Sequence, residues 1–259
     1  MRNRLALVCI SLLVTQTVLG DDQKPKFDQL KQELPGTWEC VSFQEAPKEI
    51  LHIKHITPTH YTWVTYDRQM NAILATSGGT WSFKDGKYVE ACEFASDSHQ
   101  HLRGKTFTFT INVARDKWDL RGVPGTEIEV DEVWSRMKAG EGQKTNSEPL
   151  GRQLPGTWES VSPSPEAPKA MRTVKHVTPT HWTWVAYDRE NKMVLAAAGG
   201  TWSIKGGKYE EACEFTTENF PGARSKSFAY DFKVDGDQWT IKRGPELQIQ
   251  NDEAWKRVK

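Results

Sequence analysis

Residues 54–67 read KHITPTHYTWVTYD, and residues 175–188 repeat them as KHVTPTHWTWVAYD. The likeness continues toward the N-terminus of each stretch. There LPGTWECVS at residues 34–42 returns as LPGTWESVS at residues 154–162. From residue 45 onward the two copies lie 121 positions apart. Self-similarity at one spacing predicts two copies of a single structural unit.

The repeat divides the 259-residue chain into two domains. GGTWSFKDGKYVEACEF at residues 78–94 returns as GGTWSIKGGKYEEACEF at residues 199–215, so the copies cover residues 33–138 and 153–259. The segment between them, residues 139–152, is polar and rich in turn formers, which is typical of a linker. Because a solenoid generally needs three or more units, each copy is predicted to be a closed domain.

Apolar residues in each copy follow a period of two, which predicts β-strands with one buried face. In residues 106–113 four apolar side chains alternate with Thr and Asn. Short turn signals such as Asp85-Gly86 join such stretches, so neighbouring strands should be antiparallel. We predict seven or eight strands per copy, with a short helical lead at residues 21–33.

The predicted fold class is all-β, with two tandem small antiparallel up-and-down β-barrels. A closed barrel is favoured because it leaves no strand edge exposed to other chains. A β-sandwich is the alternative.

The N-terminus has the pattern of a secretory signal peptide at residues 1–20. Arg2 and Arg4 are followed by an apolar run over residues 5–19, which is too short to span a bilayer easily. Cleavage before Asp21 would give a secreted or periplasmic protein without stable membrane insertion. An uncleaved anchor is the alternative.

Charge and cysteine content exclude two classes of protein. The chain has 34 Lys and Arg against 34 Asp and Glu, so it offers no field that would attract nucleic acid. Removal of Cys9 leaves Cys40, Cys92 and Cys213, an odd number that argues against a disulfide-stapled scaffold. Buried free thiols are favoured, and a Cys40–Cys92 disulfide is the alternative.

A Gly-Thr-Trp sequence begins the first predicted strand of each copy and ends at Trp38 and Trp158. It resembles the Gly-x-Trp signature of lipocalins, in which an Arg on the last strand packs over the Trp. Arg136 and Arg257 match that Arg and are the implied structural partners. The Lys-His-x-Thr-Pro-Thr-His-x-Thr-Trp-Val segment of both copies resembles uncharacterised secreted bacterial lipocalin-like (calycin-type) domains. The resemblance implies a fold and no established activity.

The repeated histidines and an inward glutamate are the candidate site residues. A carboxylate on an apolar face is costly unless it is paired, and His60 is a candidate partner for Glu90. Three interpretations stay open: a polar pair that fixes the core, a ligand pocket with aromatic walls, and a metal or acid–base site. The candidate ligand-binding residues are His55, His60, Trp63, Tyr66, Trp81, Glu90, His176, His181, Trp184, Tyr187, Trp202 and Glu211.

These observations lead to one preferred function. We expect a secreted, non-enzymatic binding protein for a small apolar or aromatic ligand, with no cofactor, no metal, no nucleic-acid partner and no assigned catalytic residue. The alternatives are an enzyme that uses an inward His/Glu pair in each copy, and a structural or interaction module with filled barrels. No feature of the sequence identifies a protein partner.

Overall fold

The computed structural model describes residues 23–42, 47–125, 130–140, 149–161, 168–242 and 252–259. Over these residues the chain is all-β, as predicted, apart from one α-helix and short 3-10 helices. The predicted signal peptide and residues 141–148 of the predicted linker lie outside the described residues.

Each copy of the repeat contributes eight strands to the described structure. In the first half they are β1 (Gly36–Cys40), β2 (Ile50–Ile56), β3 (His60–Asp67), β4 (Ala72–Lys84), β5 (Lys87–Ala95), β6 (Thr106–Ala114), β7 (Lys117–Gly122) and β8 (Asp131–Arg136). In the second half they are β9 (Gly156–Ser160), β10 (Met171–Val177), β11 (His181–Asp188), β12 (Met193–Lys205), β13 (Lys208–Thr216), β14 (Ser227–Asp235), β15 (Gln238–Lys242) and β16 (Glu253–Arg257).

Within each half the strands pair antiparallel in chain order, and the last strand pairs back with the first. In the first half this return pairing joins β8 to β1, with Arg136 opposite Trp38. In the second half β16 returns to β9, with Arg257 opposite Trp158. The pairings of each half therefore form a closed cycle of neighbours, and no strand of the cycle lacks a partner on either side.

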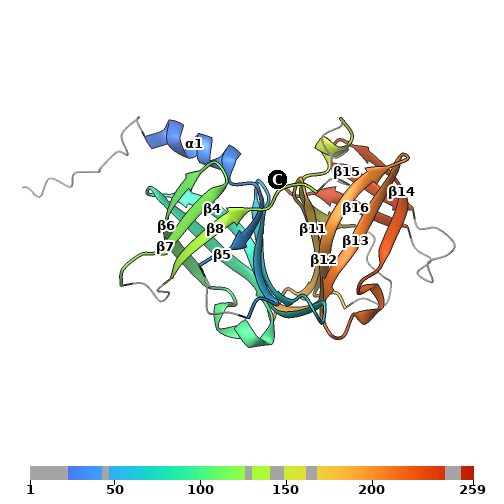
Figure 1. Cartoon of the computed structure of the whole chain (residues 1–259), viewed down its shortest axis with the longest axis horizontal. Coiled ribbons are helices and arrows are strands. Elements are labelled where there is room, and N and C mark those ends of the chain that lie inside the picture. The colour runs from blue at the N-terminus through green and yellow to red at the C-terminus, as the bar shows by residue number, and fades with distance from the viewer. Residues whose placement is uncertain (1–22, 43–46, 126–129, 141–148, 162–167, 243–251) are drawn as a thin grey trace, which may run out of the picture.

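Two parallel pairings also join the halves, so that all sixteen strands belong to one ring-like sheet. Ala95 of β5 pairs with Met193 of β12, and Ala72 of β4 pairs with Thr216 of β13. Figure 1 shows the two halves side by side, with β11 and β12 of the second half turned toward the first. The repeat in the sequence did not predict this connection.

Large aromatic side chains fill the interior of each half. An indole removes on the order of 200 Å² from water when it is buried, which is a large contribution to the core of so small a unit. The largest fully buried side chains in the interior of the first half include Trp38, Trp118, Trp134 and Tyr88, and those in the interior of the second include Trp158, Trp202, Trp239 and Tyr209.

Strand β4 serves both the interior of its own half and the contact with the other half. The register of its pairing with β5 shifts between Gly78 and Gly79. A Cβ on Gly79 would lie 2.0 Å from the carbonyl oxygen of Ala91, so only glycine allows the two backbones to approach here. Beyond this bulge Trp81 joins the first aromatic core, whereas Ile73 before it joins the core between the halves.

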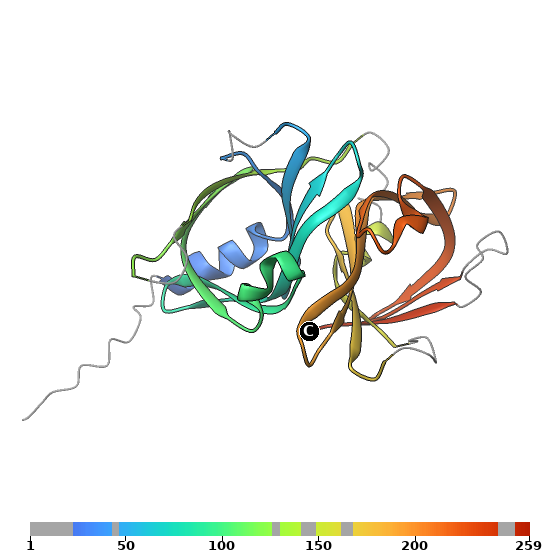
Figure 2. The same ribbon diagram turned by 90° about the horizontal axis from the view of Figure 1, so that it is seen from below.

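Helices lie at the two ends of the first half. Helix α1 (Gln23–Glu33) lies at one end, where Phe27 stacks on Phe83 with 5.1 Å between the ring centroids. The 3-10 helix η1 (Asp97–Leu102) lies at the opposite end (Figures 1 and 2). Among the described residues, no helix is both long enough and apolar enough to cross a membrane.

Candidate functional site

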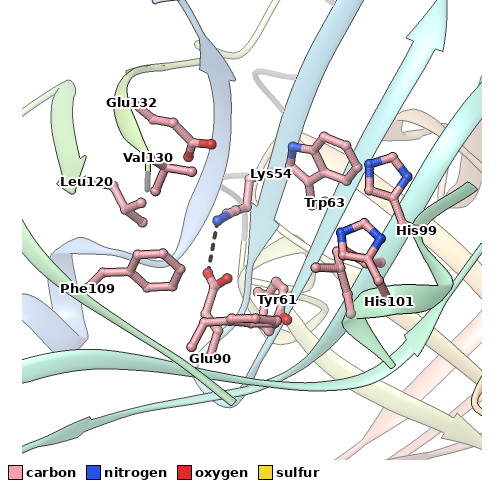
Figure 3. A pocket seen from close by; sticks show the side chains of 13 residues that line it. Lys54, Tyr61, Trp63, Glu90, His99, His101, Phe109, Leu120, Val130 and Glu132 are labelled. Atoms are coloured by element: carbon pink, nitrogen blue, oxygen red, sulfur yellow. Dashed lines mark hydrogen bonds and ion pairs between the residues drawn. The ribbon is translucent and has the colours of Figure 1, made fainter. Parts of the chain in front are cut away.

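The first half contains a cavity of about 220 Å³ at the end where η1 lies (Figure 3). Its walls come from strands β2 to β8 and from η1, and most of them are aromatic or aliphatic. The lining residues are Lys54, Tyr61, Trp63, Ser77, Glu90, His99, His101, Leu102, Phe107, Phe109, Leu120, Val130 and Glu132.

A buried ion pair lies at the centre of the cavity wall. Lys54 Nζ donates to Glu90 Oε1 over 2.9 Å, and the Tyr88 hydroxyl donates to the same oxygen over 2.9 Å. The ammonium also lies 5.2 Å from the ring centroids of both Trp118 and Trp134, within cation–π range. Charges removed from water need such partners, because a single buried charge costs several kcal/mol.

A second carboxylate, Glu132 of β8, lines the same cavity. Its Oε2 accepts a hydrogen bond of 3.0 Å from the indole nitrogen of Trp134. Burial raises the pKa of Glu132, and the charge of Glu90 adds to the rise, while Lys54 and the Trp134 hydrogen bond oppose it. The cavity thus places one ammonium against two carboxylates.

Aromatic rings and imidazoles form the mouth of the cavity. Trp63 of β3 lies 5.1 Å, between ring centroids, from His99 of η1, and His99 lies 5.8 Å from His101. Partial burial lowers the pKa of His99, and the neighbouring His101 lowers it further. The entrance is therefore lined by flat, uncharged rings, with Leu102 beside them.

The second half repeats the ion pair but has a different entrance. Lys175 donates to Glu211 over 2.8 Å and lies 3.9 Å from Glu253, the counterpart of Glu132. At the entrance, however, Phe220 stacks on Trp184 at 5.4 Å in the place that His99 takes over Trp63. The two halves therefore share a charged centre and differ where a ligand would enter.

The predicted pairing of His60 with Glu90 is wrong, because the glutamate pairs with Lys54. His55, next to Lys54 on β2, points to the opposite face, since side chains alternate along a strand. That face meets the second half of the chain, where His55 lies 5.8 Å from His181 and His60 lies 5.6 Å from His176.

The four interface histidines are buried between the two halves. Burial lowers the pKa of His60 and of His181 to about 4, and it also lowers that of His55 and His176 well below the usual value. The Nδ1 atom of each lies near a threonine hydroxyl, at 2.5 Å in the pair of Thr62 and His176. Neutral imidazoles held by hydroxyls fit a role in packing the two halves together.

The other predicted ligand-binding residues fall into three places. Tyr66 packs on Phe215 at 4.6 Å and Tyr187 packs on Phe94 at 4.8 Å, both between the halves. In the two aromatic cores the indoles of Trp81 and Trp202 are buried, and each donates 2.8 Å to a backbone carbonyl. Of the predicted first-half residues, only Trp63 and Glu90 line the cavity.

The structure brings together the Trp and Arg residues that the lipocalin resemblance pairs. The guanidinium carbon of Arg136 lies 4.0 Å from the Trp38 ring centroid, and Arg257 lies 4.0 Å from that of Trp158. Arg136 also donates to the carbonyl of Pro35 over 3.0 Å and to that of Glu33. Each pair lies where the first and last strands of its half meet.

Sequence reasoning missed Lys54, Glu132, His99 and His101. Lys54 occurs in both copies and lies opposite Trp38 and Trp63 in the sheet. The alternation of side chains along its strand could therefore have placed Lys54 on the same inward face as these tryptophans. The entrance histidines lie between strands, where periodicity carries no information. Their only signal was a difference between the copies, SDSHQHL against TENFPGA.

The described part of the chain contains neither a cluster of metal ligands nor a reactive thiol. There, no group of three or more His, Cys, Asp or Glu side chains is arranged to hold a metal ion. Cys40, Cys92 and Cys213 are buried free thiols. Burial raises the pKa of Cys92 to about 11 and that of Cys213 to about 12, so both are poor nucleophiles at neutral pH.

Comparison with known proteins adds little. No model of a known protein family matches the sequence, and no curated protein matches it. A solved structure of an uncharacterised protein from Saccharomyces cerevisiae aligns with 87% of this chain and 98% of its own, at 7% identity and a TM-score of 0.42. The Helicobacter pylori β clamp bound to a DNA ligase peptide covers 85% of this chain and 56% of its own, at 9% identity and a TM-score of 0.13. Neither likeness is close enough to support a conclusion about this chain.

Proposed function

We propose that this chain is an extracytoplasmic, non-enzymatic binding protein that holds a small aromatic or apolar ligand in its first half. The observation that carries the proposal is the cavity of about 220 Å³ with mostly aromatic and aliphatic walls and a buried Lys54–Glu90 pair. Ligand sites are typically concave and apolar, with a few fixed polar groups that orient the ligand.

The architecture proposed for this function is two lipocalin-like barrels, at residues 33–138 and 153–259. The closed cycle of strand pairing within each half supports it. The stacking of Arg136 on Trp38 and of Arg257 on Trp158 supports the resemblance to lipocalins. The two parallel pairings between the halves make them neighbours in one sheet without interrupting either cycle.

The size of the cavity limits the ligand. Pockets for drug-sized molecules measure roughly 300–1,000 Å³. The ligand proposed here is therefore smaller, with a single aromatic ring or a short aliphatic body. Trp63 and Phe109, on different walls of the cavity, are suited to contact a flat body (Figure 3).

The proposed location outside the cytoplasm depends on the sequence of residues 1–20 alone. Arg2 and Arg4 before a short apolar run favour export and cleavage. Mass spectrometry of the protein recovered from its native host tests this part. A mature N-terminus at or near Asp21 is expected, and a chain that retains residues 1–20 would refute it.

Calorimetric titration of residues 21–259 with a set of small single-ring compounds tests the binding function. Saturable binding is expected for at least one compound. Filling the cavity with Leu120→Trp should abolish that binding, because Leu120 lines the cavity. The matched control is Ile241→Trp, the same change at the equivalent position of the second half.

Circular dichroism should show that both variants are folded. Absence of saturable binding across acids, amines and neutral compounds would overturn the proposed function. Equal binding by wild type and Leu120→Trp would also overturn it, because the ligand would then bind elsewhere.

A further inference from the structure

Among the described residues that line the first-half cavity, the charged groups do not balance. Lys54 contributes one positive charge, and Glu90 and Glu132 contribute two carboxylates. Lys54 is already committed to Glu90, with 2.9 Å between Nζ and Oε1 and contacts to aromatic faces on the other sides. The partner of Glu132 is the neutral indole N–H of Trp134. With both carboxylates ionised and the imidazoles of His99 and His101 neutral, these lining residues carry one negative charge in excess.

A ligand with an ammonium group would correct this imbalance. In a cavity of low polarity a charge-assisted hydrogen bond is stronger than in water, and an unbalanced carboxylate is correspondingly costly. A ligand carboxylate would instead add a third negative group and compete with Glu90 for Lys54. The charge count therefore favours a cationic ligand over an anionic one.

The shape of the cavity orients such a ligand. Glu132 lies with Leu120 and Val130 on the side of the cavity away from Trp63 and the entrance histidines (Figure 3). An ammonium group at Glu132 would leave the rest of the molecule extending toward the entrance. Flat rings fit there because the walls on the way are aromatic.

From these observations we propose that the first-half cavity selects small aromatic amines, with the ammonium bound by Glu132 and the ring held between Phe109 and Trp63. This inference rests on the proposed function, since it names the ligand class of the same cavity. It adds a specificity-determining residue, Glu132, and a direction of binding.

Three probes of similar size test the proposal on residues 21–259 at neutral pH. They are 2-phenylethylamine, 2-phenylethanol and phenylacetate, which share a ring and differ in charge. A charge-assisted hydrogen bond is worth about 1.5–3 kcal/mol, so calorimetry should show the amine binding about 10- to 100-fold more tightly than the alcohol. Phenylacetate should bind most weakly.

Glu132→Gln replaces the carboxylate with an amide, whose oxygen can still accept the hydrogen bond from the Trp134 indole, and it removes the charge. In this variant the amine should lose its advantage over the alcohol, while the affinity for the alcohol stays within about twofold of wild type. Glu253→Gln, the same change in the second half, where Glu253 accepts from Trp255, should leave all three affinities unchanged.

A pH titration of His99→Gln/His101→Gln covers the case in which Glu132→Gln does not fold, because these two imidazoles also line the cavity and would repel an ammonium once protonated. In this variant, as the pH falls through the pKa of Glu132, amine affinity should fall and alcohol affinity should stay constant, because only the amine needs the ionised carboxylate.

Each result decides between distinct claims. Alcohol or acid bound as tightly as the amine would overturn the amine inference and leave the proposed function standing. An amine preference that survives Glu132→Gln, or an amine affinity that does not change with pH, would overturn the role of Glu132. No binding of any of the three probes would count against both the inference and the proposed function.

Discussion

The hydroxyl oxygens of Thr37 and Thr178 lie 2.7 Å apart and join the two halves of the chain. The equivalent contact, with the halves exchanged, joins Thr57 to Thr157, also at 2.7 Å. The histidine pairs and the Tyr–Phe pairs repeat the same exchange. The duplicated halves thus meet as the subunits of a two-fold symmetric dimer would, through one self-complementary surface.

This contact gives the first prediction. Thr37→Val removes the hydroxyl that contacts Thr178 and His55, and Thr178→Val removes the hydroxyl that contacts Thr37 and the backbone of His181. Each change should cost about 1–3 kcal/mol in the free energy of unfolding. A double-mutant cycle measured by urea denaturation should give a coupling of about 0.5–1.5 kcal/mol between the two sites. The control cycle pairs Thr37→Val with Thr110→Val on the exposed face of β6, and should be additive. Additivity of Thr37 and Thr178 would contradict the contact.

The second prediction concerns stability in acid. The pKa of His60 and His181 is about 4 in the folded chain against 6.5 for a free imidazole, so the unfolded state binds more protons between these values. The stabilisation is fully present above about pH 6.5 and is lost as the pH falls toward 4. The loss should be on the order of 3 kcal/mol for each of the two residues.

Urea denaturation midpoints between pH 7 and pH 4 measure this loss. The charges nearest His60 are Arg172 and Glu159, and Arg172 further disfavours a protonated imidazole there. The double variant His60→Gln/His181→Gln should make the dependence clearly shallower, with the remainder due to the buried His55 and His176. His101→Gln at the exposed entrance should leave it as steep as in the wild type. Parallel curves for wild type and double variant would refute the prediction.

The third prediction concerns the buried ion pairs. Lys54→Met leaves Glu90 buried without its cation, which should destabilise the chain by about 3–5 kcal/mol. Lys54→Met/Glu90→Gln should recover most of this loss, because Gln can still accept the hydrogen bond of the Tyr88 hydroxyl. Lys175→Met should cost about as much as Lys54→Met, since Lys175 and Glu211 are equally buried. Thermal and urea unfolding provide the measurement. A loss of less than about 1 kcal/mol in unfolding free energy for a single variant would show that the ion pair is not buried and desolvated.

The fourth prediction concerns the Arg–Trp contacts. Arg136→Lys keeps the charge but loses the planar stacking on Trp38 and the paired hydrogen bonds to backbone carbonyls. A loss of about 1–2 kcal/mol in unfolding free energy is expected. Arg257→Lys should lose a similar amount, because its geometry over Trp158 is the same. An unchanged urea midpoint in both variants would argue against a structural role.

The fifth prediction concerns the thiols. Because burial raises the pKa of Cys92 and Cys213, Ellman's reagent should react with the native chain far more slowly than with the unfolded chain. In denaturant the cleaved chain should give three thiols, from Cys40, Cys92 and Cys213. A fourth thiol would mean that Cys9 is retained, and a single thiol would mean that Cys40 and Cys92 form a disulfide.

The amino-acid sequence by itself determined the duplication, the all-β class and the aromatic interior. The duplication is evident from sequence identity between the copies, as in residues 54–67 and 175–188. Strand formation follows from a local period of two, as in β6, where the buried Phe107 and Phe109 alternate with more exposed threonines. The resemblance of the Gly-Thr-Trp segments to the lipocalin signature implied that Trp38 and Arg136 are partners, and the two side chains are in contact.

Only the tertiary structure decided which face of each strand the site occupies. Alternation separates the two faces of β2, and puts Lys54 and His55 on opposite sides, but it does not say what covers either face. Strand β3 is buried along most of its length, because one face meets the cavity and the other meets the second half of the chain. The pairing of Glu90 with Lys54 instead of His60 depends on this long-range packing, for which local periodicity holds no information.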